Sequence, residues 1–160
     1  MQRFMGKVVL VTGAGSGIGK ASALRLAAEG GSIFCVDLNR EAVESAAAEI
    51  TAEGGVATPW VCDVGNEASV QEAVGACIEG YGSLYGVVNM AGILRFDDTE
   101  ELQTDDWQKV IDINLTGTMF LCRAALPHLV ETKGSIVNAA STAALSGLPC
   151  GLAYSASKGG

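Results

Sequence analysis

Residues 8–19 read VVLVTGAGSGIG, a run of aliphatic side chains followed at once by glycines. Val8 to Thr12 is continuously aliphatic and β-branched, which is typical of a central strand buried on both faces of a sheet. Apolar residues then recur at helical spacing, so we expect a helix over 17–29. Glycines between a strand and a helix let the main chain approach a pyrophosphate, and the helix N-terminus offers it free N–H groups. The stretch therefore predicts a phosphate-binding loop.

Strand and helix patterns continue to alternate along the rest of the chain. We expect strands over 33–37, 56–61, 84–89 and 134–139, and helices over 40–53, 67–81, 105–131 and from Tyr154 onward. This alternation is typical of βαβ units, in which helices cover both faces of a parallel sheet. Right-handed crossovers would carry the chain outward on one side of the first strand and then, after the third strand, to its other side. We therefore predict an α/β fold, a Rossmann-like doubly wound parallel sheet, with its ligand crevice at that reversal.

The composition narrows the classes of function. The chain has 160 residues, of which 49% are hydrophobic, so it can form the core of a single domain over 1–160. Its formal charge is −8, and the sequence has no dense stretch of Lys and Arg that would bind a nucleic acid or an anionic membrane. The five cysteines are scattered singly, which indicates neither a disulfide framework nor a metal site. We expect a soluble, cytoplasmic protein without a metal.

Asp37 ends the second predicted strand at the distance from the glycine loop that suits a dinucleotide site. Its carboxylate can accept hydrogen bonds from both hydroxyls of an adenosine ribose and would repel the 2′-phosphate of NADP. Ser16 also stands where an NADP site would profit from a basic residue. The sequence therefore favours NAD. Asp63 and Val64, just beyond the third strand, could hold the adenine, although an ordinary helix-entry turn would also account for them.

Tyr154 and Lys158 lie four residues apart and would share one face of the last predicted helix. A phenol is a poor base at neutral pH, but a nearby ammonium and an oxidised nicotinamide would both favour its ionised form. Tyr154 is therefore a candidate general acid and base. The plainer alternative is an amphipathic helix pair. Ser141 could likewise be a turn or cap residue, and Asn114 a buried amide that satisfies backbone groups.

Taken together, these residues resemble the compact short-chain dehydrogenases/reductases. The loop over 12–19 fits their T-G-x-x-x-G-x-G pattern, and later motifs follow in the family's order and spacing over essentially the whole chain. One departure is Met90, where the family usually has Asn, which would loosen a polar contact behind the nicotinamide. The motifs are Asp63-Val64, Asn89-Met90-Ala91-Gly92, Trp107, Asn114-Leu115-Thr116-Gly117, Ser141, and Tyr154-Ser155-Ala156-Ser157-Lys158.

The resemblance implies hydride transfer between NAD(H) and a secondary alcohol or ketone. Tyr154 would be the acid/base, Lys158 would also hold the nicotinamide ribose, Ser141 would bind the substrate oxygen, and Asn114 would keep a water that links Lys158 to solvent. These four form the predicted catalytic set. The predicted cofactor-binding residues are Gly13, Ser16, Gly17, Ile18, Gly19, Asp37, Asp63, Val64, Asn89, Ala91, Gly92, Tyr154 and Lys158.

The resemblance also has implications for the C-terminal part of the domain and for the oligomeric state. Compact family members continue past the Tyr-x-x-x-Lys motif with the rest of a helix, two strands and a substrate loop, so we expect the domain over 1–160 to be incomplete at its C-terminus. The helices over 105–131 and from Tyr154 would form the subunit contact of a homotetramer or dimer. A catalytically silent nucleotide-binding or assembly module is the alternative. Such a module would need only the glycine loop and Asp37, so the four catalytic residues favour an enzyme.

Overall fold

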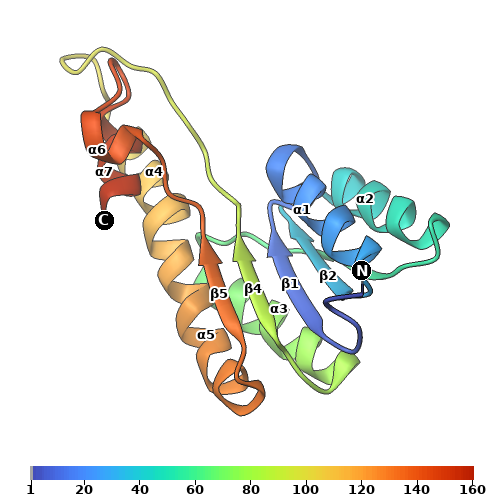
Figure 1. The fold of residues 1–160 in the computed structure, drawn as a ribbon. Coiled ribbons are helices and arrows are strands. Elements are labelled where there is room, and N and C mark those ends of the chain that lie inside the picture. Colours follow the sequence, from blue (N-terminus) through green and yellow to red (C-terminus); the bar gives the residue numbers. More distant parts are fainter. Residues whose placement is uncertain (1) are drawn as a thin grey trace.

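The computed structural model describes residues 2–160, and its centre is one parallel sheet in the order β3-β2-β1-β4-β5 (Figure 1). The chain moves outward from β1 to β3 and returns to the other side of β1 at β4. The predicted doubly wound, Rossmann-like fold is thereby confirmed. The strands are β1 (Val8–Thr12), β2 (Ser32–Asp37), β3 (Val56–Val61), β4 (Gly86–Asn89) and β5 (Ser135–Asn138).

Helices cover both faces of the sheet, as Figure 1 shows: α1 and α2 lie on one face, and α3 and α5 lie on the other. Two short helices, α6 and α7, pack against each other near the end of the chain. The bounds are α1 (Gly17–Ala28), α2 (Arg40–Ala52), α3 (Glu67–Tyr81), α4 (Thr104–Ile111), α5 (Gly117–Thr132), α6 (Ala143–Ser146) and α7 (Leu152–Gly159).

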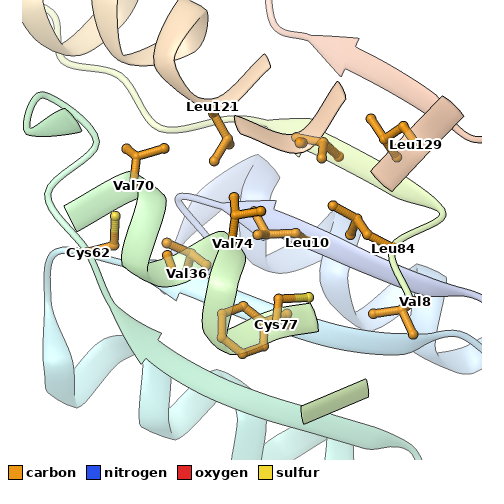
Figure 2. Packing of buried hydrophobic residues seen from close by; sticks show 14 residues of the cluster. Val8, Leu10, Val36, Cys62, Val70, Val74, Cys77, Leu84, Leu121 and Leu129 are labelled. Carbon is orange, nitrogen blue, oxygen red and sulfur yellow. The ribbon is translucent and has the colours of Figure 1, made fainter. Parts of the chain in front are cut away.

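Strand β1 is buried on both faces because its side chains alternate between two hydrophobic clusters. Val8 and Leu10 join the cluster beneath α3 and α5, part of which Figure 2 shows, whereas Val9 and Val11 join the cluster beneath α1 and α2. Burying one such side chain stabilises the fold by roughly 1.5–3 kcal/mol. The continuous aliphatic run thus makes β1 the centre of the core and fixes the position of the loop that follows it.

The helix predicted over 105–131 is interrupted in the structure. It begins at Thr104, and five residues of π-helix, η1 (Asp112–Thr116), separate α4 from α5. The Asn114 side chain bonds the main chain of Ile93 there, and π-turns of this kind are frequent at functional sites. The local pattern of apolar residues carried no sign of this interruption.

Several other boundaries differ from the prediction by one or two residues, and one short helix lies outside the predicted elements. The last helix begins at Leu152 and not at Tyr154, β4 begins at Gly86 and not at residue 84, and α6 was not predicted. Among residues 2–160, no helix is both long and apolar enough to cross a membrane. The same part of the chain contains no group of three or more His, Cys, Asp and Glu side chains that could hold a metal ion.

Candidate functional site

A cleft of about 490 Å³ lies beyond the carboxyl ends of the strands, where the reversal of the chain predicts the ligand crevice. It is lined by the residues that directly follow each strand, together with part of α7. Nearly all of the predicted cofactor residues meet there. They are Gly13, Ser16, Gly17, Ile18, Gly19, Asp37, Asp63, Val64, Ala91, Gly92, Tyr154 and Lys158.

Two glycines explain the shape of the loop at one end of the cleft. Gly13 has a φ of 64°, and a Cβ there would lie only 3.0 Å from the main-chain nitrogen of Ala91. A Cβ at Gly19 would overlap the carbonyl oxygen of Gly13, so α1 can pack this closely only with glycine at that position. The Ser16 side chain makes no capping hydrogen bond at the start of α1. The first residues of α1, Gly17 to Gly19, line the cleft, and the N–H groups at this end of the helix have no side-chain cap.

The Asp37 carboxylate is held at the cleft by two main-chain amides. Its Oδ2 accepts a hydrogen bond from Gly15 at 2.9 Å, and its Oδ1 accepts one from Asn39 at 3.0 Å. Each carboxylate oxygen can accept a further bond, so the group is oriented and still able to bind hydroxyls. The nearest following cation, Arg40, pairs instead with Glu44 at 3.4 Å and lines a separate hollow. No cation from this helix turn therefore accompanies Asp37 in the cleft.

Thr12 joins the end of β1 to the segment after β4 that lines the cleft, although its residue type and position in the sequence did not single it out as a site residue. Its side chain is 1% exposed, and its Oγ1 accepts hydrogen bonds from the main-chain nitrogens of Met90 and Ala91, each at 3.1 Å. A hydroxyl ending an otherwise aliphatic strand was the available signal. The Met90 side chain lines the cleft where the family usually has Asn.

Asp63 and Val64 enter the cleft from the end of β3. The Asp63 Oδ1 accepts a hydrogen bond from the amide of Gly65 at 2.9 Å, and its main-chain nitrogen donates to Ser69 Oγ at 3.2 Å. The segment is thus a helix-entry turn that also presents a carboxylate to the cleft.

Tyr154 and Lys158 come from successive turns of α7 and line the cleft together. The Lys158 ammonium lies 5.9 Å from the centre of the Tyr154 ring and donates a hydrogen bond to the carbonyl of Ala139 at 2.8 Å. Burial lowers the pKa of Lys158 from its ordinary value, because the charged form loses hydration. A cation is thus held close to the phenol, in surroundings partly shielded from water.

Asn114 is buried at 4% exposure and does not line the cleft. Its Oδ1 accepts a hydrogen bond from the Ile93 amide at 2.8 Å, while its Nδ2 donates to the Ile93 carbonyl at 2.9 Å and to Ser157 Oγ at 3.0 Å. Ser157 in turn donates to the carbonyl of Tyr154 at 2.8 Å. The amide therefore links the segment after β4 to the helix that carries Tyr154.

Ser141 and Asn89 are the other predicted residues that the structure leaves outside the cleft lining. The Ser141 Oγ accepts a hydrogen bond from the Ala143 amide at 3.1 Å, as a turn residue would. Asn89 is buried, and its Nδ2 donates to Asn138 Oδ1 at 2.7 Å. Both residues lie beside the site, and their side chains bond to the protein itself.

The family model for short chain dehydrogenases matches residues 7–160. The chain is 44% identical to D-threitol dehydrogenase of Mycolicibacterium smegmatis, over 99% of this chain and 61% of the relative. It is 42% identical to a 3beta-hydroxysteroid dehydrogenase of Mediterraneibacter gnavus, over 99% of this chain and 58% of the relative.

A crystal structure of NAD+-bound xylitol dehydrogenase superposes with a TM-score of 0.94 at 41% identity, over 98% of this chain and 61% of that one. The chain thus spans about three fifths of the length of these relatives. The alignments extend over nearly the whole of this chain, and the part matched by the family model includes the positions of the glycine loop and of Tyr154 and Lys158. The chain belongs to the short-chain dehydrogenase family.

Proposed function

We propose that this chain carries the catalytic site of an oxidoreductase that transfers a hydride between NAD(H) and a secondary alcohol or ketone. The observation that carries the proposal is that Tyr154 and Lys158 line the same cleft as Asp37 and the glycine loop. The relatives named above support it, since threitol, xylitol and 3β-hydroxysteroids all contain a secondary CH–OH group. So does a cyclohexanol dehydrogenase of Acinetobacter, which is 39% identical to this chain.

The residues of the cleft fit NAD in three respects. The glycine loop and the uncapped start of α1 would hold the pyrophosphate, because Gly13 and Gly19, where a Cβ would strike the main chain of Ala91 and of Gly13, bring the start of α1 close to the end of β1. Asp37 would accept the ribose hydroxyls and disfavour a 2′-phosphate. Asp63 and the main chain of Val64 would hold the adenine. When bound, the nicotinamide accepts or gives the hydride.

In the proposed chemistry, Tyr154 exchanges a proton with the substrate oxygen. During oxidation the phenolate would take the hydroxyl proton, and during reduction the phenol would return it. The Lys158 ammonium, 5.9 Å from the ring centre, would bind the nicotinamide ribose. Ser141 can still donate its hydroxyl proton to a substrate oxygen, because in the turn its Oγ serves as an acceptor.

Asn114 would hold other site residues in position and would not itself contact the cofactor or the substrate. Its amide group has its oxygen and both N–H bonds engaged with Ile93 and Ser157. It would therefore hold α7, and with it Tyr154 and Lys158, at a fixed depth relative to the segment that contains Gly92 and Ile93. The side chain has no N–H left for the relay water that the family resemblance implies, so that water would have to donate to the second lone pair of Oδ1 or be held by other groups.

The proposal is tested by mixing the protein with NAD or NADP and a panel of alcohols: threitol, xylitol, cyclohexanol and a 3β-hydroxysteroid. Formation of the reduced cofactor gives turnover, and quenching of tryptophan fluorescence gives binding. We expect NAD binding and oxidation of at least one alcohol. Binding of neither cofactor, or turnover with NADP alone, would contradict the proposal.

We also propose that the enzyme is a homo-oligomer. Support comes from three apolar residues of α5 that lie seven and four residues apart, a spacing that places them on one side of the helix. They are Met119, Leu126 and Val130, which are 44%, 54% and 68% exposed. Apolar side chains in such a row are typical of a surface that another protein chain covers. Sedimentation at micromolar concentration should show a dimer or tetramer, and Leu126→Glu should shift it toward monomer. A monomeric parent protein would remove this proposal.

The cysteines support a cytoplasmic location for the enzyme. All five are free thiols, and Cys35, Cys62 and Cys77 are buried. Burial raises the pKa of Cys35 and of Cys77 to about 12, so these thiols stay protonated and unreactive. Unpaired cysteines are usual in proteins of a reducing compartment. Cell fractionation should recover the enzyme in the cytoplasmic fraction, and recovery from an oxidising compartment would contradict this.

A further inference from the structure

A pair of asparagine side chains lies beneath Lys158, at the ends of β4 and β5. Asn89 and Asn138 are cross-strand partners in the parallel ladder, and the Asn89 Nδ2 donates to the Asn138 Oδ1 at 2.7 Å. Cys122 of α5 closes the group, with its Sγ 3.7 Å from the Asn89 Nδ2 and 3.8 Å from the Asn138 Nδ2. The proposed chemistry gives this pair no contact with cofactor or substrate.

The residue after this pair connects it to the catalytic lysine. The Ala139 amide donates to the Asn89 carbonyl at 3.1 Å, which extends the ladder one residue beyond β5. The Ala139 carbonyl then accepts the hydrogen bond from the Lys158 ammonium at 2.8 Å. Side-chain and main-chain bonds to Asn89 thus restrain the two residues, Asn138 and Ala139, that decide where this carbonyl points.

The carbonyl matters because Lys158 is partly buried. An ammonium that has lost hydration depends on the acceptors that remain, and a hydrogen bond to a charged group is stronger than one between neutral groups. The bond to Ala139 therefore offsets part of the cost of burying the charge. It also fixes the height of the ammonium in the cleft relative to the Tyr154 ring.

We propose that Asn138, together with Asn89, is a positioning residue: the amide pair aims the Ala139 carbonyl at Lys158 and so holds the ammonium in its place in the cleft. The importance of that place rests on the proposed function. The bonds themselves are properties of the chain without cofactor, so they can be tested separately. A role confined to sheet stability is the competing account.

Acylation of Lys158 separates the two accounts, because only the neutral amine reacts. The protein is pulsed with acetic anhydride in the absence of cofactor, and acetylation of Lys158 is measured by mass spectrometry against that of the exposed Lys133. Asn138→Leu removes the acceptor for Asn89, so the carbonyl is no longer aimed and the ammonium loses its partner. We expect Lys158 to be labelled faster, on the order of threefold.

Two further variants serve as controls. Asn138→Asp keeps an acceptor for Asn89, and its Lys158 should be labelled no faster than in the parent protein. Thr132→Val removes the 2.7 Å bond from the Thr132 hydroxyl to the Leu84 carbonyl, at the other end of β4, so it should lower the melting temperature without changing the labelling. Should Asn138→Leu not fold, Asn138→Ala, which also removes the acceptor, must show the same faster labelling.

The proposal would be overturned if Lys158 were labelled at the same rate in the parent protein and in Asn138→Leu, or in Asn138→Ala if the Leu variant does not fold. Faster labelling of the same size in Thr132→Val would also overturn it, because general loosening of the sheet would then explain the result. Failure of the protein to bind NAD would instead count against the proposed function and would leave the labelling result intact.

Discussion

The main-chain amide of Gly15 donates a hydrogen bond to the carboxylate of Asp37 at 2.9 Å, which joins the glycine loop to the end of β2. The loop and the carboxylate therefore form one unit. Their relative position is set by the protein itself, before any ligand binds. In the proposed function this arrangement would let a single acidic side chain select the nucleotide, because a carboxylate held in place would not turn away from a 2′-phosphate.

Replacing Asp37 with Ser should narrow the preference for NAD over NADP by about tenfold or more, because the charge that repels the 2′-phosphate is gone. The ratio of kcat/KM values for the two cofactors measures this. Asp63→Asn is the matched control, since Asp63 lines the same cleft but would bind the adenine, which both cofactors share. This change should weaken the binding of NAD and of NADP to the same extent. An unchanged ratio in Asp37→Ser would show that selection lies elsewhere.

Asn114→Ala should destabilise the protein by roughly 3 kcal/mol. The change leaves both main-chain groups of Ile93 and the Ser157 hydroxyl without their buried partner. Urea unfolding measures the loss. Asn66→Ala, which removes an exposed cap from the Ser69 amide, should cost only about 1 kcal/mol. Equal losses in the two variants would argue against the linking role of Asn114.

The ion pairs of Glu29 predict how the stability of the protein depends on pH. Its carboxylate accepts hydrogen bonds from Arg3 and Arg25, which lower its pKa from the ordinary 4.5 to about 2. Because the folded-state pKa is the lower one, the stabilisation is present above pH 4.5 and is lost as the pH falls toward 2. Glu29→Gln should flatten this part of the stability curve, as measured by urea unfolding at several pH values. Glu44→Gln, at an exposed pair, should leave the curve nearly unchanged.

The parts of the fold and site that depend on local sequence could be predicted well. The aliphatic run of β1, the glycines after it and the position of Asp37 each follow from neighbouring residues and from the spacing of βαβ units. For the same reason the pair at Tyr154 and Lys158 could be placed on one helix face. The helix begins at Leu152, two residues earlier than expected, but this shift leaves the pair on the same face.

The features that depend on distant partners could not be predicted. The π-turn at Asn114 forms where the side chain meets Ile93, 21 residues earlier in the sequence, and no helical pattern records such a contact. Asn89 was expected at the cofactor because of its motif, but its partner is Asn138 on the next strand. In each case a hydrogen-bond partner, and not a propensity, decides where the side chain points.

The central claim is that Tyr154 transfers the proton while the rest of the cleft binds NAD. Tyr85→Phe is the matched control for this claim, because Tyr85 lies outside the cleft and its ring contacts Lys7. Loss of that hydroxyl should leave both turnover and NAD binding close to those of the parent protein. Any general effect of removing a phenol oxygen from the protein is thereby accounted for.

The most direct measurement is the turnover of Tyr154→Phe alongside its affinity for NAD. Removing the phenol oxygen takes away the transferable proton but little binding surface, so kcat should fall by roughly a hundredfold or more while the Kd for NAD stays within about twofold. Turnover of Tyr154→Phe at a rate near that of the parent protein would contradict the account, because another group would then have to exchange the proton.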